Sequence, residues 1–349
     1  MNIFKKPYLF AVIYSIFLIF LSVFILLDVF IIPREVQAGQ EGFITADETF
    51  SFLEKPSGEN TETVSEQNTQ TSSSDEDITS EDTDKEEEEE TTTAVDTSPS
   101  VTYPVITDTS YEDEKIKITL TTLRLHDTQV YVADVILNSA EYFKTAIAKD
   151  KFGTNIREKT SVMAKNNNAI LAINGDYYGA DKKGYVIKNG VLYRSSVRSD
   201  YKFEDLAVMY DRSFQSVNEK EISANELLNS GVYQLFAFGP FLVENSTVTV
   251  GLNDEVGQAL ASNPRTAIGI IDDLHYVFVV SDGRTDESKG LSLYELGTFM
   301  KEYGCTTAYN LDGGGSSTMY FNGKIINNPV HIGNKTAERE VSDIVYIGY

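Results

Sequence analysis

Cysteine is nearly absent from this chain of 349 residues, since Cys305 is its only one. A single cysteine excludes an intramolecular disulfide framework, so an exported domain would have to depend on its hydrophobic core. Cys305 follows Gly304 at the end of an apolar helical pattern. We therefore expect a buried structural thiol there rather than a nucleophile.

Positive charge is also scarce, with 29 Lys and Arg residues against 53 Asp and Glu residues. Because the sequence has no basic footprint, we expect no nucleic-acid partner. The three histidines, His126, His275 and His331, lie in no motif with metal-ligand spacing. We predict no cofactor and assign no metal site, although calcium stays open because aspartates and backbone carbonyls are calcium-type ligands.

Residues 1–34 contain the one long apolar run, which has no charge from Pro7 to Leu27. At about 1.5 Å per residue this run can cross a hydrocarbon core of roughly 30 Å. Lys5 and Lys6 precede it, so the positive-inside rule predicts a cytoplasmic N-terminus and an extracellular remainder. We predict a single-pass anchor in the cell membrane, with a cleaved signal peptide ending near Val36-Gln37-Ala38 as the alternative.

Residues 35–100 are rich in Ser, Thr, Glu and Asp, with nineteen acidic and only two basic residues between positions 41 and 100. Such a segment cannot bury enough apolar surface to offset the entropy of ordering it. We predict a disordered acidic linker that acts as a self-repelling spacer and holds the following domain away from an anionic cell surface.

Residues 101–349 form the expected globular domain. Their apolar runs are mostly short and either alternating or continuous, as in KIKITLTTLRL and YVFVVSDG, which is typical of strands. Helical periodicity is confined chiefly to Asn155–Asn167 and Leu291–Tyr303. The pattern predicts a single α+β domain dominated by a mixed or antiparallel sheet, with a few helices.

Polar residues interrupt these strands at five places, in the stretches AINGDYYG, AFGPFLV, SNPRTAIG, VSDGR and NLDGGGSS. Asn-Gly-Asp and Asp-Gly-Arg are ordinary turn sequences when taken singly. Three consecutive glycines, Gly313, Gly314 and Gly315, exceed what a hairpin requires, and they would let successive N–H groups form an anion-binding nest. A P-loop would need Gly-Lys-Ser/Thr and a nucleophile elbow Gly-x-Ser-x-Gly, and neither is present.

The run NLDGGGSSTMYFNGKIINNP resembles the signature of the phosphodiester glycosidase family, and AINGDYY, GPFLV, NPRTAIG, SDGR and the ERxV motif at 338–341 follow the same family pattern in the expected order. The resemblance covers roughly residues 150–349. It implies cleavage of a sugar 1-phosphodiester at the anomeric carbon, with release of the sugar and of a phosphomonoester.

The resemblance and the residue types together give the candidate site. Asp312 is the expected base or nucleophile, with Asp282 or Asp176 as its partner. Backbone and guanidinium donors suit the phosphate, and an amide and a flat aromatic ring suit the sugar. The expected substrate-binding residues are Asn174, Gly175, Tyr177, Arg265, Arg284, Asn310, Gly313, Gly314, Gly315, Ser316 and Ser317.

An anchored extracellular domain would meet cell-envelope polymers or exopolysaccharides joined through sugar phosphodiesters. We therefore expect a membrane-tethered hydrolase whose partner is a phosphoglycan or another sugar phosphodiester. Two alternatives stay open. One is a non-catalytic module that binds a phosphorylated glycan, and the other is a transferase that passes the glycosyl group to a hydroxyl of an envelope polymer.

Overall fold

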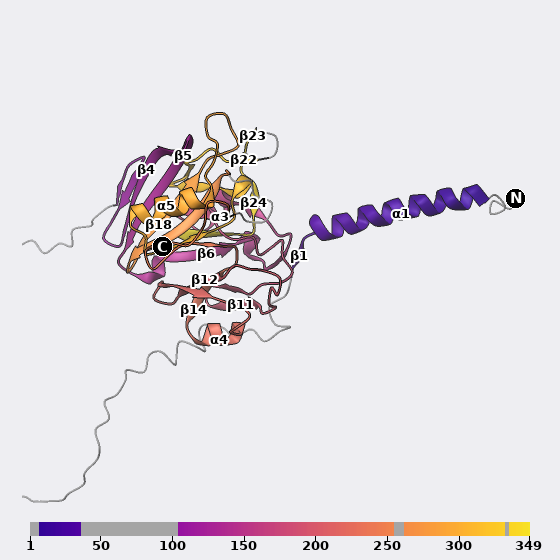
Figure 1. Cartoon of the computed structure of the whole chain (residues 1–349), viewed down its shortest axis with the longest axis horizontal. Helices are drawn as coiled ribbons and strands as arrows, with labels where there is room; N and C mark the ends of the chain where they lie inside the picture. Colours follow the sequence, from indigo (N-terminus) through magenta and orange to yellow (C-terminus); the bar gives the residue numbers. More distant parts are fainter. Residues whose placement is uncertain (1–6, 36–103, 255–261, 332–334) are drawn as a thin grey trace, which may run out of the picture.

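Two antiparallel sheets that pack face to face form the centre of the molecule in this computed structural model, which describes residues 7–35, 104–254, 262–331 and 335–349 (Figure 1). All strand pairings among these residues are antiparallel. The expected α+β, sheet-dominated fold is confirmed.

The larger sheet has nine strands. In spatial order they are β16 (Thr247–Val248), β15 (Phe241–Glu244), β19 (Thr307–Asn310), β17 (Arg265–Asp272), β18 (His275–Ser281), β5 (Thr128–Leu137), β4 (Ile116–Leu125), β3 (Ser110–Glu112) and β2 (Val105–Ile106).

The second sheet has five strands. Their order is β21 (Lys324–Ile325), β20 (Met319–Phe321), β9 (Leu171–Asn174), β25 (Asp343–Ile347) and β6 (Phe143–Ile147). The remaining strands form a three-stranded sheet and four two-stranded ribbons. These are β13 (Phe214–Val217), β12 (Asp205–Met209) and β14 (Val232–Phe236), then β10 (Val186–Lys188) with β11 (Val191–Arg194), β22 (Val330–His331) with β23 (Lys335–Thr336), β24 (Glu340–Val341) with β8 (Glu158–Lys159), and β1 (Arg34–Glu35) with β7 (Gly153–Thr154).

The α-helices of the described ranges are α1 (Pro7–Phe30), α3 (Thr160–Asn166), α4 (Ala224–Asn229) and α5 (Leu293–Tyr303), and the short 3₁₀ turns are η2 (Ala140–Tyr142), η3 (Ala148–Asp150) and η4 (Gly314–Ser316). Helices α3 and α5 lie within the two segments with helical periodicity. Ser292 caps α5 in a reciprocal capping box with Glu295, and Gly304 ends it in the left-handed conformation.

The alternation of side chains along the strands explains how the layers pack. In β18, Tyr276, Phe278 and Val280 face the five-stranded sheet, whereas Val277 and Val279 pack against α5. In the same way, one face of β25 joins the central core and the other packs against α3. The result is a four-layer arrangement in which one helix covers each outer face of the paired sheets.

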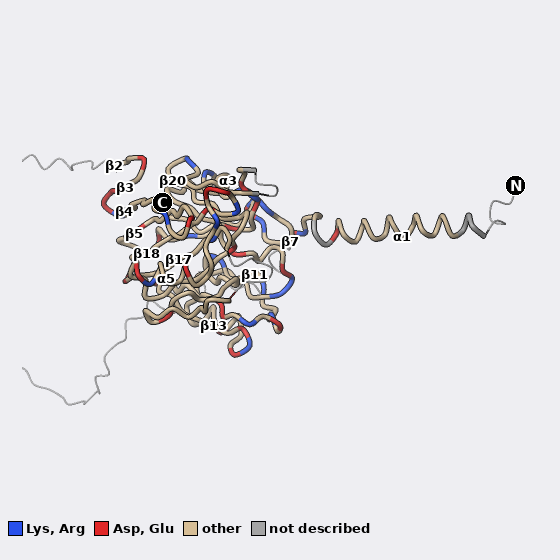
Figure 2. Tube along the Cα trace, turned by 45° about the horizontal axis from the view of Figure 1, so that its top comes forward, with Lys and Arg blue, Asp and Glu red and all other residues tan. Residues whose placement is uncertain are grey.

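Helix α1 stands out from the domain and is apolar along almost its whole length (Figure 2). Its Ala11–Asp28 window has a mean hydropathy of 2.5 and is not buried at all, which by length and composition alone suits a membrane span or a signal sequence. Directly after it, β1 pairs with β7, with Arg34 opposite Thr154 and Glu35 opposite Gly153. The chain therefore contacts the domain before the acidic segment begins, and the role of that segment as a spacer stays a prediction. Residues 36–103 themselves, most of the predicted linker, lie outside the described residues.

Candidate functional site

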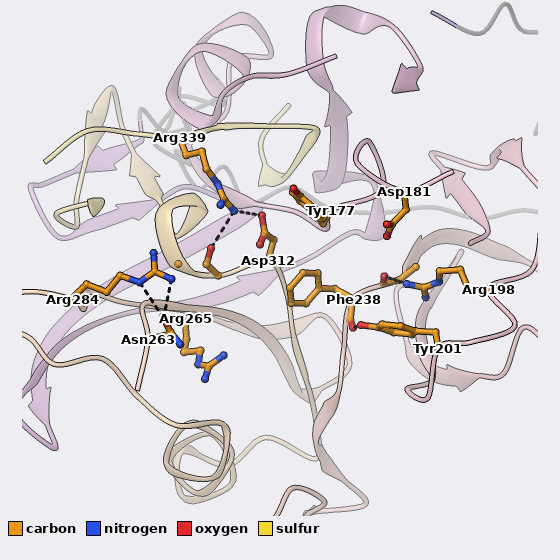
Figure 3. Close-up of a pocket in the computed structure, with 13 residues that line it drawn as sticks. Tyr177, Asp181, Arg198, Tyr201, Phe238, Asn263, Arg265, Arg284, Asp312 and Arg339 are labelled. Carbon is orange, nitrogen blue, oxygen red and sulfur yellow. Dashed lines mark hydrogen bonds and ion pairs between the residues drawn. The ribbon is translucent and has the colours of Figure 1, made fainter. Parts of the chain in front are cut away.

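The candidate site lies at one end of three adjacent strands in the middle of the larger sheet. Strand β17 starts at Arg265, opposite the end of β18 at Ser281, and β19 ends beside it with Asn310 opposite Ala267. A cavity of about 600 Å³ opens at this end of the strands. Its lining residues are Tyr177, Asp181, Arg198, Tyr201, Ala237, Phe238, Asn263, Arg265, Arg284, Asp312, Gly313, Gly314 and Arg339 (Figure 3).

Asp312 is the buried carboxylate of this cavity. Its Oδ2 accepts hydrogen bonds from Ser316 Oγ at 2.6 Å and from Arg339 Nη2 at 2.8 Å. Burial raises the pKa of Asp312 above its ordinary value, while Arg339 and Ser316 act in the opposite direction by stabilising the charged form. The carboxylate is therefore fixed in position and kept next to a cation.

The glycine turn after Asp312 is shaped by close packing. A Cβ on Gly313 would lie 2.8 Å from the Pro264 carbonyl oxygen. Gly314 has a φ of +60°, and a Cβ there would lie 2.9 Å from Nη2 of Arg284. These contacts explain the glycines better than a nest does, because the N–H groups of Gly314, Ser316 and Ser317 donate to carbonyl oxygens within the chain.

Four arginines line the cavity around Asp312 (Figure 3). Arg284 is exposed, and its Nε and Nη2 donate to the neutral Asn263 Oδ1 at 3.1 and 2.9 Å. No ion pair of Arg284 with any described residue is present, so its charge is left for an anion. Arg265 is buried, and its Nε donates to the Leu291 carbonyl oxygen at 2.9 Å.

The wall on the other side of Asp312 carries aromatic rings and a second acid (Figure 3). Arg198 lies 4.0 Å from the Tyr201 ring centroid and pairs with Asp205 at 2.6 Å, so much of its charge is compensated within the protein. Tyr177 is 40% exposed, which leaves its ring available to a ligand. Partial burial raises the pKa of Asp181, although the residue keeps an exposed surface.

Asp176 does not line the cavity. It is buried with Lys188, whose Nζ lies 3.3 Å from Asp176 Oδ2 and 2.8 Å from Asp343 Oδ2. Its oxygens also accept from the backbone N–H groups of Tyr178 and Ala237. Asp176 thus belongs to an internal ionic cluster beneath the loop that follows β9.

Asp282 is likewise placed inside the protein. Its Oδ1 accepts from the Asn328 N–H at 2.9 Å, and its Oδ2 accepts from Tyr131 Oη and Asn328 Nδ2, both at 3.1 Å. These bonds join the end of β18 to the segment before β22. Of the three expected acids, the structure brings only Asp312 to the cavity.

Several expected substrate-binding residues support the site from within the protein and do not line the cavity. Asn174 donates to the Asp312 carbonyl oxygen at 2.6 Å and accepts from Thr266 Oγ1 at 2.8 Å. Gly175 allows Asp343 to approach, since a Cβ would lie 2.4 Å from its Oδ1. Asn310 donates to the Gly239 carbonyl oxygen, and Ser317 is fully buried. Gly315 lines a neighbouring cavity instead.

The cavity also contains residues that the sequence reasoning did not assign to the site. Arg339 and Asn263 stand inside the recognised ERxV and NPRTAIG motifs, and Phe238 directly precedes the Gly239-Pro240 pair, so each had a local signal. Asp181, Arg198 and Tyr201 come from a stretch without any motif, and only the three-dimensional fold brings them in. Among the described residues no group of three or more His, Cys, Asp or Glu side chains gathers in a manner that suits a metal ion.

Comparison with known proteins decides the family. The family model for phosphodiester glycosidases matches residues 167–348, more than half of the chain. The chain belongs to the phosphodiester glycosidase family. The matched range includes Asp312, the glycine turn and all four arginines of the cavity.

Relatives of this phosphodiester glycosidase fall into two groups. The SPbeta prophage-derived uncharacterized protein YomE of Bacillus subtilis is 33% identical over 201 residues, which are 57% of this chain and 31% of that protein. The mouse N-acetylglucosamine-1-phosphodiester alpha-N-acetylglucosaminidase is 32% identical over 107 residues, which are 29% of this chain and 20% of that enzyme. The chain thus spans about a third or less of the length of these relatives.

A solved structure shares the fold of this phosphodiester glycosidase. It is the zebrafish N-acetylglucosamine-1-phosphodiester alpha-N-acetylglucosaminidase catalytic domain, auto-inhibited by its pro-peptide, with a TM-score of 0.53 and 20% sequence identity. The match covers 67% of this chain and 83% of that domain.

Proposed function

We propose that this domain hydrolyses sugar 1-phosphodiesters by breaking the bond between the anomeric carbon and the phosphate oxygen. The observation that carries the proposal is the arrangement of one buried carboxylate, Asp312, in a cavity that four arginines also line. A cavity that only held an anion would gain nothing from a buried carboxylate facing the same space, because the two negative charges repel.

The arginines suit the departing phosphate. As the C1–O bond breaks, negative charge grows on the leaving phosphomonoester, and preorganised guanidinium groups stabilise that charge. Arg284, with its uncompensated charge, and Arg265 form the phosphate side of the cavity in this proposal. A phosphate stabilised in this way leaves without a proton from a carboxylic acid, which is why one buried carboxylate suffices.

Asp312 serves the anomeric carbon. It either takes a proton from the attacking water or attacks C1 itself, and both roles need the ionised carboxylate. Arg339 and Ser316 hold Oδ2 and favour ionisation. Tyr177, Tyr201 and Phe238 offer aromatic surface to the sugar, and Asp181 is the second acid within the cavity. Neither Asp282 nor Asp176 takes part in this mechanism.

The apolar helix α1 supports placement of the domain at the outer face of a cell membrane, in line with Lys5 and Lys6 before it. We propose that its substrates are phosphodiester-linked sugars of the cell envelope or of extracellular polysaccharide. With water as the acceptor the products are a free sugar and a phosphomonoester, whereas a transferase would deliver the sugar to a hydroxyl of another polymer.

Purified full-length chain in detergent tests the proposal, with wild type, Asp312→Asn and Asp273→Asn compared on hexose 1-phosphate methyl diesters and UDP-N-acetylglucosamine. Asp273 is exposed in the turn between β17 and β18, at the opposite end of these strands from the site. We expect Asp312→Asn to lower kcat by about 100-fold or more and Asp273→Asn to leave it unchanged. Free sugar and methyl phosphate are followed separately, and an active Asp312→Asn variant would contradict the assigned role.

A further inference from the structure

A second cavity of about 500 Å³ adjoins the first, because Arg284 and Arg339 line both. Its lining residues are Arg157, Lys159, Arg284, Gly315, Val330, Glu338, Arg339 and Glu340. Nothing in the mechanism proposed above uses this space. It contains four basic residues and two acidic ones, although the domain as a whole carries more acidic than basic residues.

One of the two acids is already engaged with the protein. Glu338 Oε1 accepts from the Ser161 N–H at 2.9 Å, and its Oε2 accepts from Ser161 Oγ. Glu338 and Glu340 together oppose four basic side chains, one of which, Arg339, is also paired with Asp312. Lys159 makes no ion pair with any residue in the described ranges, although it lies opposite Glu340 in the β8–β24 ribbon. The second cavity therefore has an excess of positive charge that suits an anionic ligand.

The glycine turn forms the connection between the two cavities. Gly313 and Gly314 line the first cavity, and Gly315 lines the second. None of these three residues carries a side chain that could stand between the two cavities. A side chain at Gly314 would also push against the guanidinium of Arg284, which both cavities share.

The arrangement of residues in the first cavity indicates which part of a substrate would reach the second cavity. Its aromatic residues and Asp312 lie away from Arg284, as Figure 3 shows. A sugar placed at Asp312 against the rings would have its phosphate towards Arg284, and the second cavity would receive whatever follows that phosphate. The second cavity is therefore on the side of the leaving group.

We propose that the second cavity is a subsite for the next phosphate along a phosphodiester-linked polymer, and this proposal rests on the function proposed above. The substrate class is then a chain with phosphate groups in successive units rather than a lone sugar phosphodiester. Arg284 lies between the two phosphates, and Arg157 and Lys159 bind the second one.

The test uses full-length chain in detergent and two synthetic substrates of the same hexose, a 1-phosphate methyl diester with one phosphate and its dimer with two. The variant is Arg157→Gln with Lys159→Gln, which touches only the second cavity. The matched control is Lys301→Gln with Lys324→Gln, which removes two positive charges from α5 and β21. Thermal unfolding confirms that both variants fold.

For wild type and control we expect kcat/KM to be about tenfold higher for the dimer than for the methyl diester, since a charge-assisted contact contributes about 1.5 kcal/mol or more. The Arg157→Gln, Lys159→Gln variant should lose this preference and keep its activity on the methyl diester. Equal losses on both substrates, or no dimer preference in wild type, would overturn the subsite.

Binding of 1,3-propanediol bisphosphate and of inorganic phosphate, measured by calorimetry, separates this proposal from the function. A variant that binds the bisphosphate about tenfold more weakly but inorganic phosphate equally would support the subsite even if no sugar is released. Unchanged bisphosphate affinity would overturn it.

A phospholipid headgroup is the other source of a phosphate near this cavity, because Arg157 and Lys159 follow β7, which pairs with β1 directly after α1. Nanodiscs with and without phosphatidylglycerol distinguish the two sources. The same dimer preference in both supports the polymer, whereas its loss only in phosphatidylglycerol discs would assign the cavity to the lipid.

Discussion

Arg339 donates from Nη2 to Asp312 Oδ2, and from Nε to Ser316 Oγ, which itself donates to the same carboxylate oxygen. Burial raises the pKa of Asp312, and the guanidinium opposes this rise. If ionised Asp312 is required, activity is lost as the pH falls through its pKa. In Arg339→Gln the pKa should rise further, so the acidic limb of the kcat profile should move to higher pH.

The matched variant for this prediction is Arg284→Gln. Arg284 lines the same cavity but bonds Asn263 rather than Asp312. We expect it to raise KM and leave the acidic limb of kcat in place. Rates measured between pH 4 and 9 compare the two variants. Identical acidic limbs for Arg339→Gln and wild type would show that Asp312 is not the titrating group.

Lys188 is the cation of the buried cluster with Asp176 and Asp343, and its side chain is only 1% exposed. Burial acts to lower the pKa of Lys188, but the two carboxylates outweigh this effect and raise it. Lys188→Met should cost about 3–5 kcal/mol of stability near neutral pH, because two buried carboxylates lose their partner. The exposed pair of Lys324 with Asp108 provides the control, and Lys324→Met should change stability by less than about 0.5 kcal/mol.

The pH dependence of this loss has a defined sign. Burial raises the pKa of Asp343 to about 7 even with Lys188 present, so the folded protein binds more protons than the unfolded chain between about pH 4 and 7. A carboxyl group whose pKa is higher in the folded state stabilises the fold fully when the pH is below its unfolded-state pKa. This stabilisation disappears as the pH rises through the folded-state pKa. Urea unfolding should therefore show a smaller deficit for Lys188→Met at pH 5 than at pH 8, and equal deficits would contradict the account.

The sequence predicts Asp312 as the base or nucleophile and Asp282 or Asp176 as its partner, but only Asp312 lines the cavity. Asp312, Asp282 and Asp176 all follow apolar strands in the same manner. Their difference lies in partners far away in the chain, such as Asn328 for Asp282 and Lys188 for Asp176. Such contacts depend on the packing of whole sheets, and one sequence does not specify them.

At the scale of elements, the turn η4 after β19 connects the fold to the site. Gly314 combines a φ of +60° with close approach of Arg284. In Gly314→Ala the methyl group should displace the guanidinium. We expect KM to rise by about tenfold, the equivalent of 1.4 kcal/mol of phosphate binding, in steady-state kinetics on the methyl diester.

Gly323 supplies the control for backbone strain. It also has a positive φ, +87°, but a Cβ there would meet no heavy atom within 4 Å. Gly323→Ala should cost about 1 kcal/mol of stability and leave KM unchanged. If both variants raised KM alike, strain rather than displacement of Arg284 would be the cause.

The regular elements were predictable where a local signal exists. Alternating side chains in β18 and the periodic apolar residues of α5 are consequences of sheet and helix geometry, so the sequence shows them directly. Helix α4 was not foreseen, since its six residues are too few to show a period. The order of nine strands in one sheet was equally invisible, because it places β19 between β15 and β17 across long stretches of chain.

At the scale of the whole molecule, the connection between α1 and the domain is short and specific. Asn155 Nδ2 donates to the Ile32 carbonyl oxygen at 3.4 Å, and Lys151 pairs with Glu35 at 2.8 Å. A composition-based view places the acidic segment between anchor and domain, but the pairing of β1 with β7 fixes the domain directly after α1. If α1 spans a membrane, the second cavity is held near its surface.

Gly153 makes this attachment possible, since a Cβ on it would lie 1.7 Å from the Arg34 carbonyl oxygen. Gly153→Val should therefore separate β1 from β7 without disturbing the site. Trypsin cleavage after Arg34, followed by mass spectrometry of detergent-solubilised chain, should become several-fold faster, because pairing opposes the local opening that a protease needs. Gly251→Ala, whose Cβ would make only an ordinary 3.6 Å contact with Asp254, should cleave at the wild-type rate. Equal cleavage of all three chains would mean that β1 does not hold the anchor against the domain in solution, and that the acidic segment is free to set the distance between them.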